Sequence, residues 1–434
     1  CYPENPEAGI DLFLEKLVQE TEKEHEDILE QADETDAMFG ELYSWYLRNP
    51  EYRSRVQKLV QSAFAGKPED IISQSVAKAL YGEVSPYSAT RLERFAACAF
   101  AHFLQYGMKL TERVEYEFKP MDMGNVMHEA LESFAEEVRK RGMKWTELTE
   151  QERNEIADRC LDNIVADYGN TVLKSSARNE YMIERTRRIL RRTVWALQKQ
   201  LEQGEFQPEG FEVTFGGGRI DRVDIMEDQN KVYVKVIDYK TGNTSFDLVY
   251  LYHGLQLQLM IYLDGALRVE QKKYPDKEII PAGSFLYNIK DPMIQEKIDA
   301  DVEAVSAGLM KELKMNGLVQ ADPELVYRMD SSLGSIPVAF NKDGSFRKNS
   351  SVADRTQFAV LGRYVRTKIE KIRSSILEGD AEVSPYELGK KNACTYCPYM
   401  TVCGFDRRLS GYEFRRLKNF SDEELWKAFD REAE

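Results

Sequence analysis

The stretch GRIDRVDIMEDQNKVYVKVIDYKTGN, residues 218–243, predicts two β-strands that each carry a carboxylate near one end. Residues 219–226 and 231–239 are rich in β-branched and aromatic side chains, which is typical of strands, and polar turn residues separate them. Asp221 ends the run RID, and Asp238 ends the run KVID. Because an unpaired buried carboxylate is costly, the two acids indicate either solvated strand ends or a binding site.

Lys240 adds a cation to this pattern. It follows Asp238 by two residues, so on an extended strand both side chains point to the same face. Mg²⁺ prefers oxygen ligands and keeps waters that a phosphate can displace. An ammonium group beside a metal-bound water can orient that water and stabilise charge at phosphorus. The triplet D-x-K alone is a common pattern, but a preceding strand that also carries an acid makes it a moderate signal for a metal-dependent site.

The surrounding pattern predicts an α/β core inside a largely helical chain. A boundary is expected near 81–90, where Gly, Pro and Ser interrupt the helical pattern, and Thr90 and Glu93 have capping-box spacing. We therefore expect a helical segment at 1–84 and a second domain at 85–434. The further elements predicted are strands at 211–215 and 282–289, a mainly helical region from 90 to 204, and helices at 254–267 and 356–377.

Length and composition predict a soluble, globular protein. The chain has 434 residues, 42% of them hydrophobic, and no run approaches the roughly 20 apolar residues that span a bilayer. The net charge of −15 argues against a nucleic-acid partner, but 184–199 and 407–418 are locally basic. Each basic stretch is either a solvated helix face or part of a basic groove. Since the first residue is Cys1, we expect a fragment of a longer protein.

The cysteine spacing predicts a metal or cluster site rather than disulfides. Cys394, Cys397 and Cys403 form C-x2-C-x5-C, and Cys98 is the candidate fourth ligand. Four thiolates suit a structural zinc ion or an iron–sulfur cluster equally well, and His102 would allow a Cys3His zinc site. Cys160 is expected to be a buried core thiol.

Four motifs together resemble the core of RecB-family nucleases in the PD-(D/E)xK superfamily. They are a G-x-x-D strand (218–221), a D-Y-K strand (238–240), a Q-x-x-x-Y helix (258–262) and a G-x-x-x-H helix (124–128). The resemblance implies a restriction-endonuclease-like fold, in which helices flank a short mixed sheet.

The same resemblance implies the site residues. The metal ligands would be His128, Asp221, Asp238 and the Tyr239 carbonyl, with Mg²⁺ as the ion. A lone histidine is more often structural, but the GNVMHEALE context favours a site role. Glu212 is a further candidate acid. The catalytic and supporting residues would be Asp221, Asp238, Lys240, Gln258 and Tyr262.

Residues 85–420 also resemble AddB-type subunits of helicase–nucleases, through SATRLERFAACAFAHFLQYGMKL (88–110) and ELGKKNACTYCPYMTVCGFD (387–406). This resemblance implies a [4Fe-4S] cluster that ties the ends of the nuclease domain together. Its ligands would be Cys98, Cys394, Cys397 and Cys403. By analogy with disulfides, a link that closes so long a loop should stabilise the fold.

The expected function is that of a bacterial, cytoplasmic, Mg²⁺-dependent deoxyribonuclease (exonuclease). By resemblance, it trims the 5′-ended single strand of unwound DNA during double-strand-break repair by recombination, in a heterodimer with an AddA-like helicase–nuclease. No G-x-x-x-x-G-K-[ST] sequence occurs, so ATP use is expected of the full-length protein and chiefly of its partner. Two alternatives stay open: a catalytically silent iron–sulfur scaffold that binds DNA or a partner, and a stand-alone RecB-like or Cas4-like exonuclease.

Overall fold

The structure, a computed structural model, divides the chain into two compact units that are interleaved in sequence. We name them the cysteine unit (1–80, 98–109 and 378–418) and the sheet unit (81–97, 110–377 and 419–434). The residues described are 34–63, 71–82, 87–111, 120–167, 176–216, 218–294, 301–409 and 411–433. Cys1 and the rest of 1–33 therefore lie outside the described residues.

The sheet unit is built on a mixed sheet of six strands in the order β1-β2-β3-β4-β5-β6. The first three strands pair antiparallel, whereas β3 pairs parallel with β4, and the chain crosses between these two through α11. The pairing of β4 with β5 is antiparallel and that of β5 with β6 is parallel. The strands are β1 (Gln207–Phe215), β2 (Gly218–Glu227), β3 (Lys231–Lys240), β4 (Glu278–Asn288), β5 (Asn316–Gln320) and β6 (Val352–Ala353).

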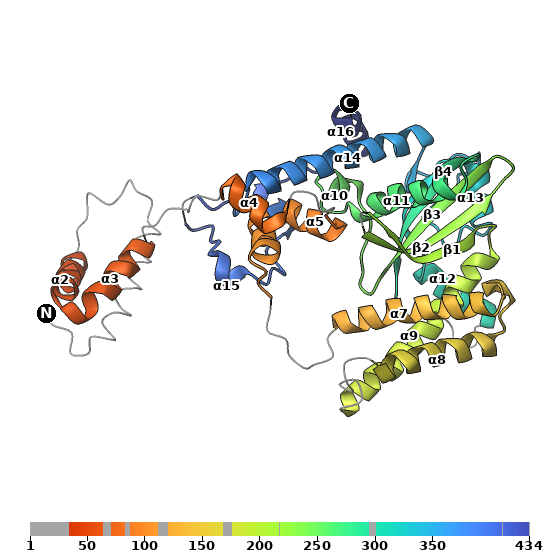
Figure 1. Ribbon diagram of the computed structural model, residues 1–434, viewed down its shortest axis with the longest axis horizontal. Coiled ribbons are helices and arrows are strands. Elements are labelled where there is room, and N and C mark those ends of the chain that lie inside the picture. Colours follow the sequence, from red (N-terminus) through yellow and green to blue (C-terminus); the bar gives the residue numbers. More distant parts are fainter. Residues whose placement is uncertain are drawn as a thin grey trace. The chain divides into compact units, whose positions relative to one another are not determined.

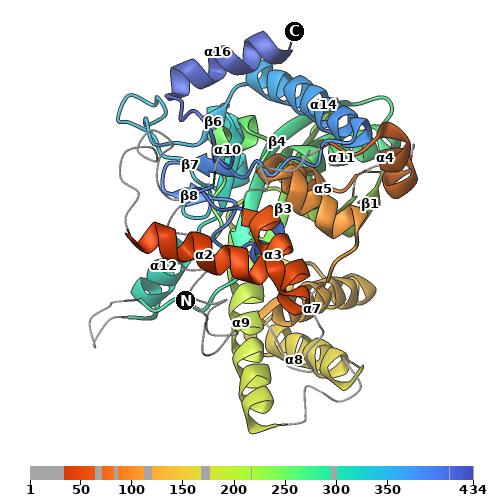
Figure 2. The ribbon, with the colours of Figure 1, turned by 90° about the vertical axis from the view of Figure 1, so that its left-hand side faces the viewer.

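Helices cover both faces of this sheet (Figures 1 and 2). On one face, α7, α8 and α9 share a hydrophobic core with Ile237, Tyr239 and Phe285 of the strands. On the other face α11 packs on β3 and β4, and the Ser284 hydroxyl donates a 3.0 Å hydrogen bond to the Leu259 carbonyl. Because side chains alternate along a strand, Asp238 and Lys240 lie on the α11 face. The helices of this unit are α5 (Ala89–Ala97), α7 (Pro120–Lys140), the 3₁₀ helix η2 (Trp145–Glu147), α8 (Glu150–Asp167), α9 (Ala177–Glu202), α10 (Leu248–Tyr252), α11 (Gln258–Lys273), α12 (Val302–Glu312), α13 (Pro323–Met329), α14 (Arg355–Glu378) and α16 (Asp422–Ala433).

The predicted strands and the helix at 356–377 are confirmed, but the helix predicted at 254–267 begins later. The chain turns after α10, and Gly254 has a φ of 78°, which favours glycine. A Cβ on Gly254 would also lie 3.2 Å from Ala96. Residues 254–257 therefore form a connection, and α11 begins at Gln258.

The cysteine unit combines short helices with a small three-stranded sheet in the order β8-β7-β9. Its distant segments pair through their backbones: Ile71 bridges to Asp380, and the Phe100 N–H donates to the Glu382 carbonyl at 3.0 Å. None of the helices in the described part of the chain is long and apolar enough to cross a membrane. The elements of this unit are α2 (Glu34–Arg48), α3 (Pro50–Ala63), α4 (Gln74–Tyr81), α6 (Ala99–His102), the π-helix η1 (Phe103–Gly107), β7 (Tyr386–Leu388), β8 (Lys391–Asn392), α15 (Met400–Cys403) and β9 (Arg415–Arg416).

Candidate functional site

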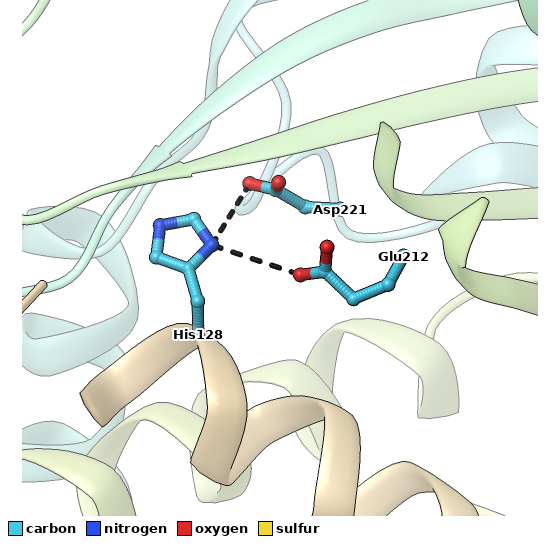
Figure 3. Close-up of side chains that lie close together, drawn as sticks. All are labelled: His128, Glu212 and Asp221. Carbon is cyan, nitrogen blue, oxygen red and sulfur yellow. Dashed lines mark ion pairs between the residues drawn. The ribbon is translucent and has the colours of Figure 1, made fainter. Parts of the chain in front are cut away.

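Three ligand-type side chains from different elements meet at one end of the β1–β2 pair. One ligand atom each of His128, Glu212 and Asp221 lies within 4.8 Å of the other two (Figure 3). His128 Nδ1 lies 3.4 Å from Asp221 Oδ2 and 4.0 Å from Glu212 Oε1. We call these three residues the ligand cluster. It includes two predicted metal ligands and Glu212, which was predicted only as a further acid.

Local backbone features bring the ligand cluster together. His128 lies one turn after Gly124 on α7, and a Cβ at Gly124 would come within 3.3 Å of the Thr241 hydroxyl, just after β3. The glycine of the G-x-x-x-H motif thus lets α7 approach the end of β3 closely. Glu212 has a φ of 48°, which is unusual for a residue other than glycine and indicates local strain in β1.

A second group, formed by Asp238, Lys240, Gln258 and Tyr262, lies on the α11 face of the sheet. We call it the β3–α11 network. Lys240 Nζ lies 2.6 Å from Asp238 Oδ2 and donates a 2.8 Å hydrogen bond to Gln258 Oε1. The Gln258 amide in turn donates to Asp238 Oδ1 at 3.1 Å and to the Tyr262 hydroxyl at 2.9 Å. The four predicted residues therefore form one connected network, in which Gln258 bonds to the other three and fixes the orientation of both the acid and the ammonium group.

Asp221 connects the two groups. Its Oδ2 accepts a 2.7 Å hydrogen bond from the Tyr239 N–H, so the acid on β2 is tied to the backbone of β3 between Asp238 and Lys240. The Tyr239 ring packs edge-on against His128, with 6.1 Å between ring centroids. The Tyr239 carbonyl stays a prediction as a metal ligand.

The electrostatics of the site suit a divalent cation. Burial, and then the charge of Asp221, raises the pKa of Glu212 to about 7 and that of Asp238 to about 6. Burial lowers the pKa of His128, but its hydrogen bond to Asp221 and the neighbouring carboxylates outweigh this and raise the pKa overall. Acids crowded in this way disfavour their own charged forms, and a bound cation reverses that preference. One imidazole and clustered carboxylates are donors that suit such an ion.

Glu93 is a residue of this site that sequence reasoning placed wrongly. Helix α5 begins at Ala89, so Thr90 lies inside the helix and the predicted capping box is wrong. The Ser88 hydroxyl lies at the helix start instead and accepts a 3.4 Å hydrogen bond from the Arg91 N–H. The Glu93 carboxylate instead accepts a 2.9 Å hydrogen bond from the N–H of Gln258, at the start of α11. Burial raises the pKa of Glu93 to about 7. An acid at a helix N-terminus satisfies free N–H groups, so Glu93 helps to place Gln258.

Asp224, the second acid of β2, has a structural environment. It is fully buried and is paired with Arg222 at 2.6 Å and with Lys235 at 3.1 Å. The Arg222 guanidinium also lies over the rings of Trp145 and Phe211. The charge of Asp224 is thus balanced inside the core, and among the described residues Asp224 is not part of the ligand cluster.

The four predicted cluster cysteines lie together in the cysteine unit. Cys98, Cys394, Cys397 and Cys403 line one small cavity together with Phe100, Tyr399 and other apolar residues. Burial, and then the neighbouring thiols, raises the pKa of Cys394 to about 12. His102, the alternative zinc ligand, is not among the described residues that line this cavity, whereas Cys98 is. Cys160 is buried in the sheet unit, as predicted.

Comparisons with known proteins agree with this architecture. The family model described as the PD-(D/E)XK nuclease superfamily matches residues 86–404. Three curated relatives are each named as the B-type subunit of an ATP-dependent helicase/deoxyribonuclease. The relative from Lachnoclostridium phytofermentans is 41% identical over 92% of this chain and 36% of its own length. Those from Alkaliphilus metalliredigens and Thermoanaerobacter sp. (strain X514) are 34% and 33% identical, each over 92% of this chain and 37% of its own length.

The chain thus spans a little more than a third of the length of these relatives. The family match covers the six-stranded sheet, the elements from α5 to α15 and the four cysteines that line the cavity. The chain belongs to the PD-(D/E)XK nuclease superfamily.

Proposed function

We propose that this chain is a Mg²⁺-dependent deoxyribonuclease that hydrolyses phosphodiester bonds of single-stranded DNA. One observation carries the proposal: the ligand cluster lies beside the β3–α11 network, and the Asp221–Tyr239 hydrogen bond joins them. A metal-dependent nuclease needs oxygen and nitrogen ligands on one side of the phosphate and a positioned cation nearby. The strand ends supply both.

Different residues of the site would bind the metal ion, stabilise charge and hold these groups in position. His128, Glu212 and Asp221 would hold the ion, with Asp238 and the Tyr239 carbonyl as the further ligands implied by the family motifs. Bound Mg²⁺ would lower the pKa of a coordinated water and offset negative charge on the phosphate. Lys240, held by Asp238 and Gln258, can donate a hydrogen bond to the attacking water or to a phosphate oxygen. Tyr262 keeps Gln258 in place.

A substitution at Asp238 tests this function. We expect Asp238→Ala to reduce cleavage of a labelled single strand in Mg²⁺ by at least about a hundredfold, because it removes an acid and the partner of Lys240. Asp276→Ala, at an exposed acid before β4, is the matched control and should cleave like the unmodified chain. Circular dichroism and iron content should be unchanged in both variants. Full cleavage by Asp238→Ala would refute the assignment.

The cellular role is suggested by the relatives' names and belongs to a longer protein. We propose that the chain is the nuclease region of an AddB-like subunit and works with an AddA-like helicase–nuclease. It would trim the 5′-ended strand at double-strand breaks before recombinational repair. Mixing the full-length protein with such a partner and following each labelled strand of a duplex end tests this role. If Asp238→Ala stopped trimming of the 3′-ended strand and left trimming of the 5′-ended strand intact, the strand assignment would be contradicted.

A [4Fe-4S] cluster on Cys98, Cys394, Cys397 and Cys403 is the second part of the proposal. All four cysteines line one pocket, which supports a single group bound by all of them. An anaerobically purified sample should contain about four irons per chain, with matching sulfide. Stoichiometric zinc instead would contradict the cluster but leave the nuclease site intact.

A further inference from the structure

A groove on the helical side of the sheet unit gathers the basic residues of 184–199. It encloses about 1980 Å³ of space open to solvent, between α9, the start of α8 and α12. None of its lining residues belongs to the ligand cluster or to the β3–α11 network. The proposed nuclease chemistry therefore leaves this groove unexplained.

The basic stretch has two faces with different surroundings. Arg187 and Arg191 turn toward acids of α8: Arg187 lies 2.7 Å from Asp162, and Arg191 pairs with Asp158. These two arginines hold α9 on α8 and account for the structural part of the stretch. Within the described part of the chain, by contrast, Arg185 and Arg192 form no ion pair.

The other face forms a continuous stripe along α9. Its members follow at steps of three and four residues, so they lie on one side of the helix. Between the first and the last the helix rises about 27 Å, with roughly one side chain per turn. Two members also form ion pairs, Arg188 with Asp291 and Lys199 with Glu202, so the unpaired charge of the stripe lies on its other arginines. The stripe consists of Tyr181, Arg185, Arg188, Arg192, Trp195 and Lys199.

A buried cation at one wall of the groove is the second observation. Arg153 is only 6% exposed, yet among the described residues it forms no ion pair with a carboxylate. Its guanidinium donates a 2.7 Å hydrogen bond to Gln198 Oε1, and its Nε has no hydrogen-bond partner. Gln198 is itself fixed by a 2.8 Å hydrogen bond to the Leu148 carbonyl. Glu150 and Glu202, which also line the groove, act on Arg153 without forming an ion pair with it. A buried charge without a paired counter-ion is costly, so Arg153 indicates an anionic ligand.

From these two observations we infer that the α9 groove binds the backbone of single-stranded nucleic acid. Arginines spaced along the stripe and Arg153 would contact successive phosphates, for which the planar guanidinium is well suited. Tyr181, which is 64% exposed, offers an aromatic surface on which an unpaired base can stack, whereas Trp195 packs against the core and positions Arg192, which lies over its ring. The inference rests on the proposed function for the identity of the substrate, and it assigns the groove a holding role apart from bond cleavage.

Fluorescence anisotropy with a labelled dT30 strand in EDTA tests binding without cleavage. We expect Arg185→Glu/Arg192→Glu to weaken binding by about tenfold or more, and to lower the slope of log affinity against log salt by at least about 1.4. Arg363→Glu/Lys427→Glu makes the same change in net charge at exposed positions outside the groove and should bind like the unmodified chain. Arg153→Gln should also weaken binding. Equal affinities for both double variants would overturn the inference.

Two comparisons distinguish DNA binding by the groove from the proposed DNA cleavage. Asp238→Ala should lose cleavage but keep its affinity for dT30, whereas Arg185→Glu/Arg192→Glu should still cleave an oligonucleotide too short to reach the groove. If the chain binds dT30 through the groove but cuts no DNA, the proposed function fails alone. If it cuts DNA and the double variant binds normally, the groove inference fails alone. A poly-glutamate peptide, added at a concentration that matches the negative charges of dT30, tests whether the groove prefers an acidic protein segment. Displacement of dT30 by this peptide would assign the groove to such a segment and overturn the inference.

Discussion

Glu212 and Asp238 are acids whose environment favours their neutral forms. Their pKa values rise from 4.5 to about 7 and from 3.8 to about 6, so the folded state binds more protons than the unfolded chain in this range. The stabilising contribution is present at about pH 4 and is lost as the pH rises toward 7. Without metal, the melting temperature should therefore fall from pH 5 to pH 8 more steeply than in Glu212→Gln.

Mg²⁺ should reverse this dependence, because it favours the charged carboxylates. We expect the rise in melting temperature on adding Mg²⁺ to be small at pH 5 and larger at pH 8. Thermal unfolding in EDTA and in Mg²⁺ at each pH measures the difference. A rise that is greatest at pH 5, or one that Glu212→Gln leaves unchanged, would remove Glu212 from the ion's ligands.

Glu93 gives a second prediction at the scale of one residue. Glu93→Ala leaves the N–H of Gln258 without its acceptor and should cost about 1–3 kcal/mol of stability. Since Gln258 holds Lys240 and Asp238, the rate constant for cleavage should fall while the affinity for DNA stays the same. Glu93→Gln retains an acceptor oxygen and should restore most of the rate. A Gln variant as slow as the Ala variant would show that the charge of Glu93, rather than its hydrogen bond, is needed.

At the scale of elements, the β1–β2 hairpin needs a glycine at position 218. Gly218 has a φ of 149°, and a Cβ there would lie 3.4 Å from the Tyr262 ring. The Cβ itself would make an ordinary contact with that ring, so the expected cost of Gly218→Ala, about 1–3 kcal/mol, comes from backbone strain beside Tyr262, which should also slow cleavage. Gly216→Ala, two residues earlier, meets nothing within 4 Å and is the matched control. Melting temperature and cleavage rate of both variants test this, and equal behaviour would contradict it.

The elements that the sequence predicts well are those whose apolar side chains recur at a regular spacing. Strands β2 and β3 and helix α14 have long runs of regularly spaced apolar side chains, and their predicted bounds agree with the structure to within two residues. The short strands β5 and β6, of five and two residues, carry too few side chains for a period to appear. Gly254 interrupts a run that otherwise has helical composition, which is why the predicted start of α11 is misplaced.

The site is predictable where motif residues contact one another along β2, β3 and α11. Glu93 could not be assigned, because its spacing to Thr90 fits a local capping box equally well and its real partner is 165 residues away. The role of Glu212 depends on a left-handed backbone conformation that its sequence context does not reveal. The arginines of α9 likewise look alike in the sequence. Only the packed structure shows that Arg187 and Arg191 pair with acids of α8, whereas other arginines of α9 form no ion pair within the part of the chain that the structure describes.

At the scale of the whole molecule, the chain enters and leaves the cysteine unit repeatedly. Residues 98–109 and 378–418 belong to this unit, although the sheet unit occupies most of the sequence between them. Besides the cysteine cavity, these segments are joined by the Phe100–Glu382 hydrogen bond and by a core in which Cys98 and Leu104 pack with Tyr399. A small core of this kind needs a further link to be stable.

The proposed cluster supplies that link, so losing one ligand should affect folding more than chemistry. We expect Cys397→Ser to lose most of its iron, to melt at a lower temperature and to be cut by protease within 378–418. Cys160→Ser, a buried thiol of the sheet unit, is the matched control: it should retain iron even if its melting temperature falls slightly. Iron content, thermal unfolding and limited proteolysis of both variants measure the effect. A Cys397→Ser variant that loses iron but keeps an unchanged melting curve would show that the cysteine unit holds together without the cluster, and the site would then need a role other than structural support.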